Sequence, residues 1–190
     1  MPLVVQMHGE PGSGKSTLAR AFAPRIGAIV LDKDVIKAGL LTSGISERDA
    51  AAGAYEAYFA LARSFVDAGH GVVLDNPVFW PRVEARWLAL AAVAGSAPIL
   101  IECVCPDAGE LRRRLATRPA LASQLREPLD LSRHPGATAT SFRPRLTLDT
   151  RRAIAELVDD VIAYVTTLVP PHDRSSSVEA SPLAEPIVRP

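Results

Sequence analysis

The stretch Leu3-Val-Val-Gln-Met-His-Gly-Glu-Pro-Gly-Ser-Gly-Lys-Ser-Thr-Leu-Ala-Arg20 decides the fold. Its first part, Leu3–His8, is an apolar run of strand length, and Gly9–Ser16 fits the pattern G-x-x-x-x-G-K-[ST]. A helical pattern begins at Thr17. Strand, loop and helix in this order form the context that a phosphate-binding (Walker A) loop requires. The alternative is a glycine-rich turn that fits by chance, but the lysine, the serine and the flanking strand together favour a nucleoside triphosphate site.

The loop residues have distinct expected roles. The glycines let the backbone bend so that its N–H groups point at a phosphate, and the helix adds the positive end of its dipole. Lys15 is expected to reach the β- and γ-phosphates, and the Ser16 hydroxyl to ligate Mg²⁺. The residues expected to bind ATP in this segment are Gly9, Glu10, Pro11, Gly12, Ser13, Gly14, Lys15, Ser16 and Thr17.

Length and composition indicate one domain. The chain has 190 residues, 48% of them hydrophobic, which suffices to bury a single core over residues 1–169. The 21 basic residues balance the 21 acidic ones, so there is no general field for attracting nucleic acid. Residues 170–190 are rich in Pro and Ser and have no period, which predicts a mostly disordered tail.

The compartment is predicted from absent signals and from cysteine usage. No apolar stretch has the length of a membrane span, and the first apolar run is assigned to a strand rather than to a signal peptide. Cys103 and Cys105 are expected to be reduced thiols, because C-x-C alone lacks the partners of a zinc site. We therefore expect a cytoplasmic protein with no membrane partner.

Strand-length apolar runs alternate with helical patterns along the chain. The runs lack polar alternation, as strands buried on both faces do, and cover residues 3–8, 28–31, 72–74, 99–105 and 146–148. Helical patterns cover about 15–25, 34–41, 46–68, 82–94, 107–118 and 151–168. In the helix over 46–68, Ser46 and Asp49 have capping-box spacing and Gly69 follows the end. This alternation predicts an α/β fold in three layers, with a mainly parallel sheet covered by helices on both faces.

Two carboxylates, Asp32 and Asp34, follow the second strand. The carboxyl ends of parallel strands face the crevice where such sheets bind ligands. Phosphoryl transfer to a hydroxyl needs a carboxylate that accepts the hydroxyl proton and oxygen ligands for Mg²⁺. We assign Asp34 as the base and Asp32 as a contact to Mg²⁺-bound water or an ordering contact for the loop. The alternative is that Asp34 is only the N-cap of the next helix.

A third carboxylate, Asp75, ends the apolar strand Val72–Leu74 and is followed by Asn-Pro. A strand that ends in Asp matches a Walker B element, whose carboxylate helps to hold Mg²⁺. The same residues are also typical of a plain turn. The position downstream of the Walker A strand favours the metal role.

The helix predicted over 107–118 has two faces. Leu111 and Leu115 give a packed face, while Arg114 and Arg118, also four apart, give a basic one. Guanidinium groups suit bidentate contacts with phosphate oxygens and stacking on a base. A solvated helix surface is the alternative. Pro119 closes the helix and a loop follows, as a movable lid over about 107–135 would require.

Over residues 1–168 the chain resembles the small P-loop kinases, AAA-type ATP-binding proteins of the branch with polynucleotide 5′-hydroxyl kinase, chloramphenicol phosphotransferase and zeta-toxin-like kinases. The resemblance is carried by Gly9–Ser16, Asp32–Lys37, Val72–Asp75 and the segment from Pro106 to Arg118. It implies a five-stranded parallel sheet of order 2-3-1-4-5, with the Asp75 strand beside the Walker A strand. It also implies roles for single residues: Asp34 as base, Lys37 (where polynucleotide kinases tend to have Arg) on acceptor or phosphate, Arg114 and Arg118 as lid arginines, with Arg114 catalytic, and Asp149 and Thr150 beside the adenine.

The acceptor site is expected over the helices after the second strand. Aromatic residues there include Tyr55, with core packing as the alternative, and Phe79 and Trp80 in a turn, where they would cover a ligand. Between residues 38 and 81 the basic residues are only Arg48 and Arg63, with His70, which is few for a polynucleotide groove. This favours a small, largely uncharged hydroxyl compound, such as an antibiotic, nucleoside or sugar.

Three functions remain open from the sequence. The first is an ATP- and Mg²⁺-dependent kinase that phosphorylates a hydroxyl of a small molecule. The second is a polynucleotide or nucleotide-sugar kinase, acting in repair or as a toxin. The third is a nucleotide-switched binding protein without acceptor chemistry, which would leave Asp34 without a base role.

Overall fold

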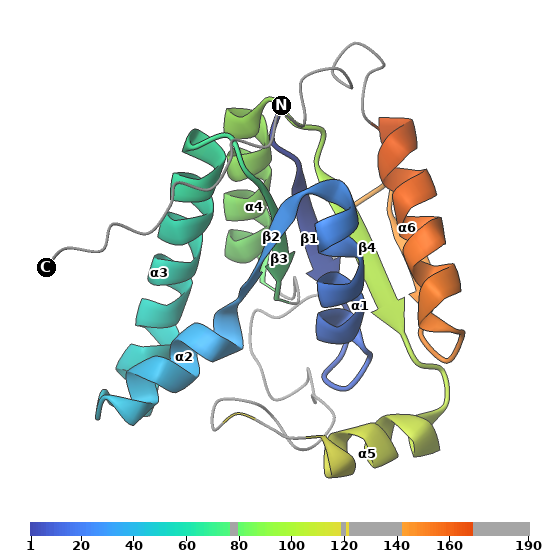
Figure 1. The fold of residues 1–190 in the computed structure, drawn as a ribbon. Coiled ribbons are helices and arrows are strands. Elements are labelled where there is room, and N and C mark those ends of the chain that lie inside the picture. The colour runs from blue at the N-terminus through green and yellow to red at the C-terminus, as the bar shows by residue number, and fades with distance from the viewer. Residues whose placement is uncertain (77–79, 119–120, 122–141, 169–190) are drawn as a thin grey trace, which may run out of the picture.

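One sheet organises the molecule, as a computed structural model of residues 1–76, 80–118, 121 and 142–168 shows (Figure 1). Within these ranges its strands pair in parallel in the order β2-β3-β1-β4-β5, which confirms the predicted sheet. The strands are β1 (Val4–His8), β2 (Ala28–Asp32), β3 (Gly71–Asp75), β4 (Ile99–Val104) and β5 (Leu146–Asp149).

Helices cover both faces of the sheet, which completes the predicted three layers (Figure 1). Two of them, α3 and α4, cover one face, and α1 and α6 cover the other, whereas α2 and α5 lie beyond the carboxyl ends of the strands. The helices are α1 (Lys15–Phe22), the 3₁₀ turn η1 (Ala23–Ile26), α2 (Lys33–Thr42), α3 (Glu47–Asp67), α4 (Pro81–Ala94), α5 (Ala108–Thr117) and α6 (Ile154–Leu168).

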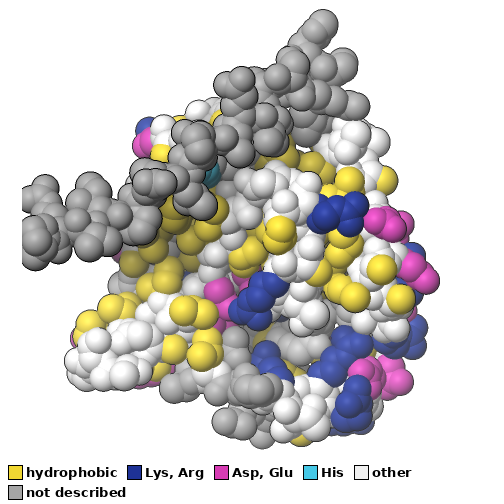
Figure 2. Space-filling model, viewed as in Figure 1, with side chains coloured by type: hydrophobic (Ala, Val, Ile, Leu, Met, Phe, Trp, Pro, Cys, Tyr) yellow, Lys and Arg dark blue, Asp and Glu magenta, His cyan; other side chains and the backbone are white. Residues whose placement is uncertain are grey.

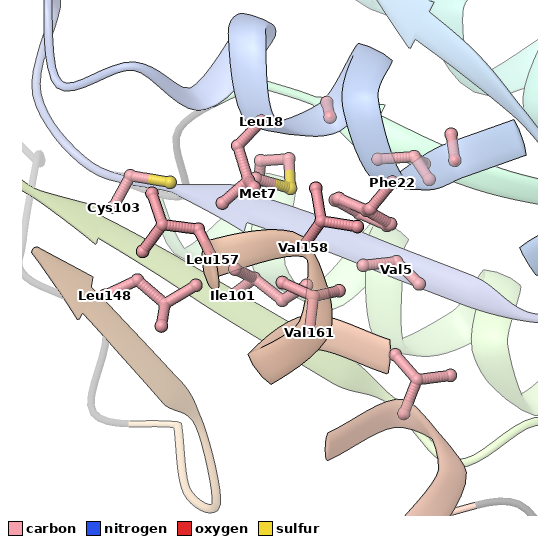
Figure 3. Packing of buried hydrophobic residues seen from close by; sticks show 14 of the residues in the cluster. Val5, Met7, Leu18, Phe22, Ile101, Cys103, Leu148, Leu157, Val158 and Val161 are labelled. Carbon is pink, nitrogen blue, oxygen red and sulfur yellow. The ribbon is translucent and has the colours of Figure 1, made fainter. Parts of the chain in front are cut away.

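Strand β1 contributes to the core on both faces of the sheet. Val4 packs with Tyr58 and Trp87 of α3 and α4, and all three side chains are fully buried. On the other face, Met7 lies with Leu18 of α1 and with the α6 side chains (Figure 3). Each such buried side chain contributes about 1.5–3 kcal/mol from hydrophobic transfer. The strand and helix on either side of the Walker A loop are therefore fixed by packing.

Burial of the strands differs from the prediction in two places. β2 and β5 are half-buried rather than buried on both faces, because they are the edges of the sheet and each has a single neighbour. Within the central strand β1, the apolar run contains two buried polar side chains, Gln6 and His8. Burial lowers the pKa of His8 to about 4, which keeps the imidazole neutral.

Local signals set the helix ends. The Ser46 hydroxyl accepts from the Asp49 N–H at 3.2 Å, as the capping box predicts, and Gly69 follows α3 with φ of +86°. Helix α1 ends at Phe22, earlier than predicted, since Pro24 starts a 3₁₀ turn. In the described part of the chain, no helix is long and apolar enough to cross a membrane. Both cysteines are free thiols, as predicted.

Candidate active site

The Walker A loop joins β1 to α1 and is tightly enclosed. Gly9, Gly12 and Gly14 have φ of +132°, +82° and +88°, a region that side chains rarely allow. A Cβ on Gly9 would lie 2.2 Å from the carbonyl oxygen of Cys103, so the loop closes directly on β4. These are backbone conformations and approaches that only glycine permits.

Helix α5 and the turn after β5 form the outer wall of the loop. A Cβ on Gly12 would meet the Leu115 side chain at 2.9 Å, and one on Gly14 would meet Thr150 at 3.3 Å. Leu111 and Leu115 are the packed face of α5, as predicted. Helix α5, which lies in the segment expected to form a lid, therefore packs against the phosphate-binding loop.

The Lys15 side chain lies across its own loop. Its Nζ donates to the carbonyl oxygens of Gly9 at 2.9 Å and Glu10 at 2.8 Å. Burial lowers the pKa of Lys15, and the charges of Asp75 and Asp34 oppose that shift. The ammonium group is therefore held among carbonyls and carboxylates where the sequence places the phosphates.

Asp75 lies at the carboxyl end of β3, 5% exposed. Burial raises its pKa to about 6, partly offset by a hydrogen bond in which the Ser16 hydroxyl donates. Its Oδ2 has no hydrogen-bond partner among the described residues. Asp32 is its register partner on β2. The structure thus brings together Ser16, Asp32 and Asp75, the residues that the sequence assigns to the metal.

These residues fit a hydrated Mg²⁺ bound with a nucleotide. A buried carboxylate oxygen without a partner and a serine hydroxyl supply the oxygen donors that Mg²⁺ prefers. The described residues hold no group of three or more His, Cys, Asp or Glu that could hold a metal ion by itself. A Mg²⁺ ion here would take its remaining ligands from phosphates and water.

Asp75→Asn should stabilise the nucleotide-free protein at neutral pH. The folded pKa is raised from 3.8 to about 6, so the stability contribution of Asp75 is present below pH 4 and lost as the pH rises through 6. Burying the ionised carboxylate costs roughly 2–3 kcal/mol of folding free energy, and this cost applies in full only above about pH 6. Asn cannot ionise, so the substitution removes it. Thermal unfolding of both proteins should therefore show a gain for the variant at neutral pH that shrinks toward pH 4. A gain of equal size at both pH values would contradict the assigned pKa.

Asp32, rather than Asp34, caps helix α2. The Asp32 Oδ1 accepts from the backbone N–H of Asp34 at 2.9 Å, and its Oδ2 accepts from Arg20 Nη2 at 3.1 Å. The alternative in which Asp34 is the N-cap is wrong, because β2 continues to Asp32 and the helix begins at Lys33. The Asp34 carboxylate is therefore not used by the cap.

The Asp34 side chain lies in the first turn of α2. The Lys33 Nζ is 2.5 Å from the Asp34 Oδ1 and 5.5 Å from the ring centroid of Tyr55. The Tyr55 hydroxyl donates to the Asn76 Oδ1 at 3.3 Å, just beyond the end of β3. Asp34 and Tyr55 thus both lie beside the Lys33 ammonium group, on the helices over which the sequence places the acceptor.

Three further residues are assigned to the acceptor in the sequence, and the structure describes two of them. The Lys37 Nζ pairs with Glu47 at the start of α3. Trp80 is the N-cap residue of α4 and packs against the core formed with Trp87. Phe79 lies outside the described residues.

Arg114 and Arg118 both line a cavity of about 710 Å³ beside the Walker A loop. Arg114 is fixed there: its Nη1 and Nη2 donate to the hydroxyl and carbonyl of Thr150 at 2.9 and 3.0 Å, and its Nε donates to Glu110 at 2.7 Å. Figure 2 shows Lys and Arg side chains grouped over α5 and beside α1. The other lining residues that carry charge are Lys15, Arg20, Arg113 and Arg152.

Of the two residues expected beside the adenine, Thr150 lines the cavity and Asp149 does not. Thr150 lines the cavity and touches both Gly14 and Arg114. Asp149 instead accepts from the Arg151 side chain at 2.5–3.0 Å, and these bonds lower its pKa to about 2. The apolar part of the cavity wall comes from Leu121, Ile154 and Leu157.

The structure adds site residues that the sequence reasoning missed. Arg20 and Lys33 contact Asp32 and Asp34, and Glu110 holds Arg114. Arg20 has a signal in the sequence, since it lies on the helix that starts at Lys15. The link between Arg114 and Thr150 joins residues 36 positions apart and has no local signal.

The sheet order and the glycine loop between β1 and α1 define a three-layer P-loop protein with the fold of the small P-loop kinases. Residues 4–134 match the sequence model of an AAA domain family, and the chain belongs to that family. Uncharacterized proteins of Mycobacterium tuberculosis and Mycobacterium bovis are 34% identical over 107 residues, or 50% of this chain. The match spans 22% of the length of these curated relatives.

Solved structures share the fold at low sequence identity. A candidate kinase from Chloroflexus aurantiacus has a TM-score of 0.66 at 23% identity, covering 88% of this chain and 98% of that one. APS kinase of Mycobacterium tuberculosis, in complex with AMPPNP and APS, has 0.58 at 24%, covering 87% and 98%. A sugar kinase from Janibacter sp. has 0.59 at 18%, covering 90% and 97%.

Proposed function

We propose that this protein is an ATP-dependent phosphotransferase that moves the γ-phosphate of ATP to a hydroxyl group of a small molecule. One observation carries the proposal. The Asp34 carboxylate, which the helix cap does not use, lies near a Walker A lysine and beside the Asp32–Asp75 pair at the carboxyl edge of the sheet. A switch protein without acceptor chemistry would need the loop but not this carboxylate.

Different residues of the chain are assigned to phosphate binding, metal binding and proton transfer. The backbone N–H groups of the Walker A loop, which Pro11 lacks, and the Lys15 ammonium bind the phosphates, and Thr150 lines the pocket assigned to the nucleotide. Ser16, Asp32 and Asp75 would hold a Mg²⁺ ion and its bound water, and the ion would neutralise negative charge on the phosphates. Asp34 accepts the proton of the acceptor hydroxyl as that oxygen attacks the γ-phosphorus, while the bond from the γ-phosphorus to the β,γ-bridging oxygen breaks and ADP leaves.

We assign the acceptor to the region of α2, α3 and the start of α4. The hydroxyl of Tyr55 lies there, beside Asn76. We propose that Lys37 and Trp80 also contact the acceptor, as the sequence proposes for Phe79, which lies outside the described residues. The basic residues Arg63 and Arg86 of α3 and α4 are paired with Asp67 and Glu56, which does not provide a track for a polynucleotide backbone. Two proteins of this fold are named kinases of APS and of sugar, which supports a small-molecule acceptor.

The proposal extends to the organisation of the chain. We assign residues 1–169 to the kinase domain, with a lid over about 107–135 and a tail over 170–190. Of the lid, the structure describes residues 107–118, which include α5, and Leu121. The free thiols Cys103 and Cys105 suit the cytoplasm.

An acceptor screen tests the proposal. The protein is incubated with Mg²⁺, γ-labelled ATP and separate pools of antibiotics, nucleosides, sugars and 5′-hydroxyl oligonucleotides. The expected result is label on a compound of one of the first three pools. Label only on the oligonucleotides would make the protein a polynucleotide kinase, and label on none of the pools, with ATP still bound, would favour a nucleotide switch.

Arg114→Ala should weaken ATP binding by roughly 10- to 100-fold, the range of one or two charge-assisted hydrogen bonds. The substitution removes the link from α5 to Thr150 as well as a cation at the pocket. Arg113→Ala is the matched control, because Arg113 lines the same cavity but its guanidinium group donates to Glu110 and not to Thr150. Calorimetric titration with ATP should separate the two variants. Equal losses would mean that the basic face acts only through its general charge.

A further inference from the structure

Gln6 is a polar side chain in the middle of strand β1 and is fully buried. Its Nε2 donates to the carbonyl oxygens of Met7 at 2.7 Å, Leu74 at 3.1 Å and Asn76. A buried amide costs free energy unless it is hydrogen-bonded, and these carbonyls, with Leu74 in β3 and Asn76 just after it, satisfy its donor group. The Oε1 atom of Gln6 has no hydrogen-bond partner among the described residues. The amide therefore ties the Walker A strand to the residues that follow β3.

This contact lies where the backbone pairing of β1 with β3 stops. The register runs from Val4 opposite Val72 to Gln6 opposite Leu74 and goes no further. On its other side, β3 stays paired with β2 up to Asp32 opposite Asp75. Beyond Leu74, the Gln6 side chain takes the place of the missing strand neighbour.

The two carbonyls at the end of β3 that Gln6 binds flank Asp75. Asp75 accepts from the Ser16 hydroxyl, and the Asn76 side chain accepts from Tyr55. A shift of this short segment would move Asp75 relative to the Walker A loop. The Gln6 amide is thus placed to fix the distance between the Asp75 carboxylate and Ser16.

We propose that Gln6 is a positioning residue, whose amide holds the Leu74–Asn76 backbone so that Asp75 stays beside Ser16 to support the Mg²⁺ of bound ATP. The inference rests on the proposed function for the identity of this ligand. It does not depend on the acceptor, since Mg²⁺–ATP binding precedes any transfer. Residues that orient metal-supporting side chains typically change metal affinity about 10- to 100-fold when they are replaced.

Gln6→Met tests the inference by removing the donor and keeping the side-chain length. ATP binding is titrated calorimetrically at a series of Mg²⁺ concentrations and in EDTA. The Mg²⁺ concentration that gives half of the gain in ATP affinity should rise about tenfold or more, while binding in EDTA stays at the wild-type level. The thermal midpoint of the ligand-free protein is recorded alongside.

Val4→Ala is the matched control. Val4 is fully buried two residues earlier on the same strand and packs on the same face. It should lower the thermal midpoint without changing the Mg²⁺ requirement. If Gln6→Met does not fold, Gln6→Asn takes its place, since its shorter amide cannot span both carbonyls, and the same rise is expected.

A Gln6 variant that folds and keeps the wild-type Mg²⁺ requirement would overturn the inference. So would an equal rise for Val4→Ala, or wild-type ATP binding that does not depend on Mg²⁺. The proposed function fails differently: a protein whose Mg²⁺–ATP binding depends on Gln6, but which phosphorylates no acceptor, would keep this inference and lose the kinase activity.

Discussion

Lys15→Ala should lower ATP-dependent turnover by about 10²-fold or more, the effect of removing one contact to developing charge in the transition state. The ammonium group donates to the carbonyls of Gly9 and Glu10 and lies near the charges of Asp75 and Asp34. It therefore lies at the loop, where the phosphates are expected. Its loss removes a cation that the remaining loop N–H groups cannot replace.

Lys15→Met is the matched variant, because it keeps the aliphatic stem and removes only the charge. Both variants should lose turnover to the same extent and bind ATP more weakly by calorimetry. Thermal unfolding shows whether each variant is folded. Turnover near the wild-type rate in either folded variant would remove the Walker A assignment.

Asp34→Asn should reduce phosphoryl transfer by roughly 10²- to 10⁴-fold, the usual contribution of a general base, and leave ATP binding largely unchanged. The substitution removes the proposed proton acceptor without removing the cap of α2. The N-cap is Asp32, so Asn at position 34 keeps the helix start and its backbone bond. The pair with Lys33 is partly exposed and contributes at most about 1 kcal/mol to stability.

Two variants of the neighbouring aspartate are the controls. Asp32→Ala removes the cap and should cost about 1 kcal/mol of stability, whereas Asp32→Asn keeps a good cap and should cost less. Transfer is measured with labelled ATP and the acceptor from the screen. If Asp34→Asn transfers phosphate at the wild-type rate, Asp34 is not the base, and Asp32 is the next residue to test.

The sequence was sufficient to predict the sheet and the position of the loop. Strand-length apolar runs, glycine spacing and caps are local signals, and the parallel order followed from a resemblance to a known fold. The cap of α2 was not predictable in the same way. Asp32 and Asp34 are both good cap residues, and only the pairing of Asp32 with Asp75 extends β2 far enough to decide between them.

Other parts of the site depend on contacts that no local pattern contains. In the sequence, Arg114 belongs only to the basic face of a helix. In the structure its guanidinium group donates to the hydroxyl and carbonyl oxygens of Thr150, which lies 36 residues further along the chain. The half-buried state of β2 and β5 follows from their edge positions rather than from their composition. Gln6 stands out in the sequence only as one polar residue in an apolar strand, and its partners at the end of β3 become visible in the fold.

The central claim is that Asp34 is the general base when this protein transfers the γ-phosphate of ATP to a hydroxyl compound. The most direct measurement is a single-turnover reaction, in which wild-type and Asp34→Asn proteins preloaded with Mg²⁺ and γ-labelled ATP are mixed with the acceptor pools. The wild-type protein should pass the label to a small hydroxyl compound, while the variant keeps it on ATP. Label released only as inorganic phosphate, at the same rate from both proteins, would contradict the claim.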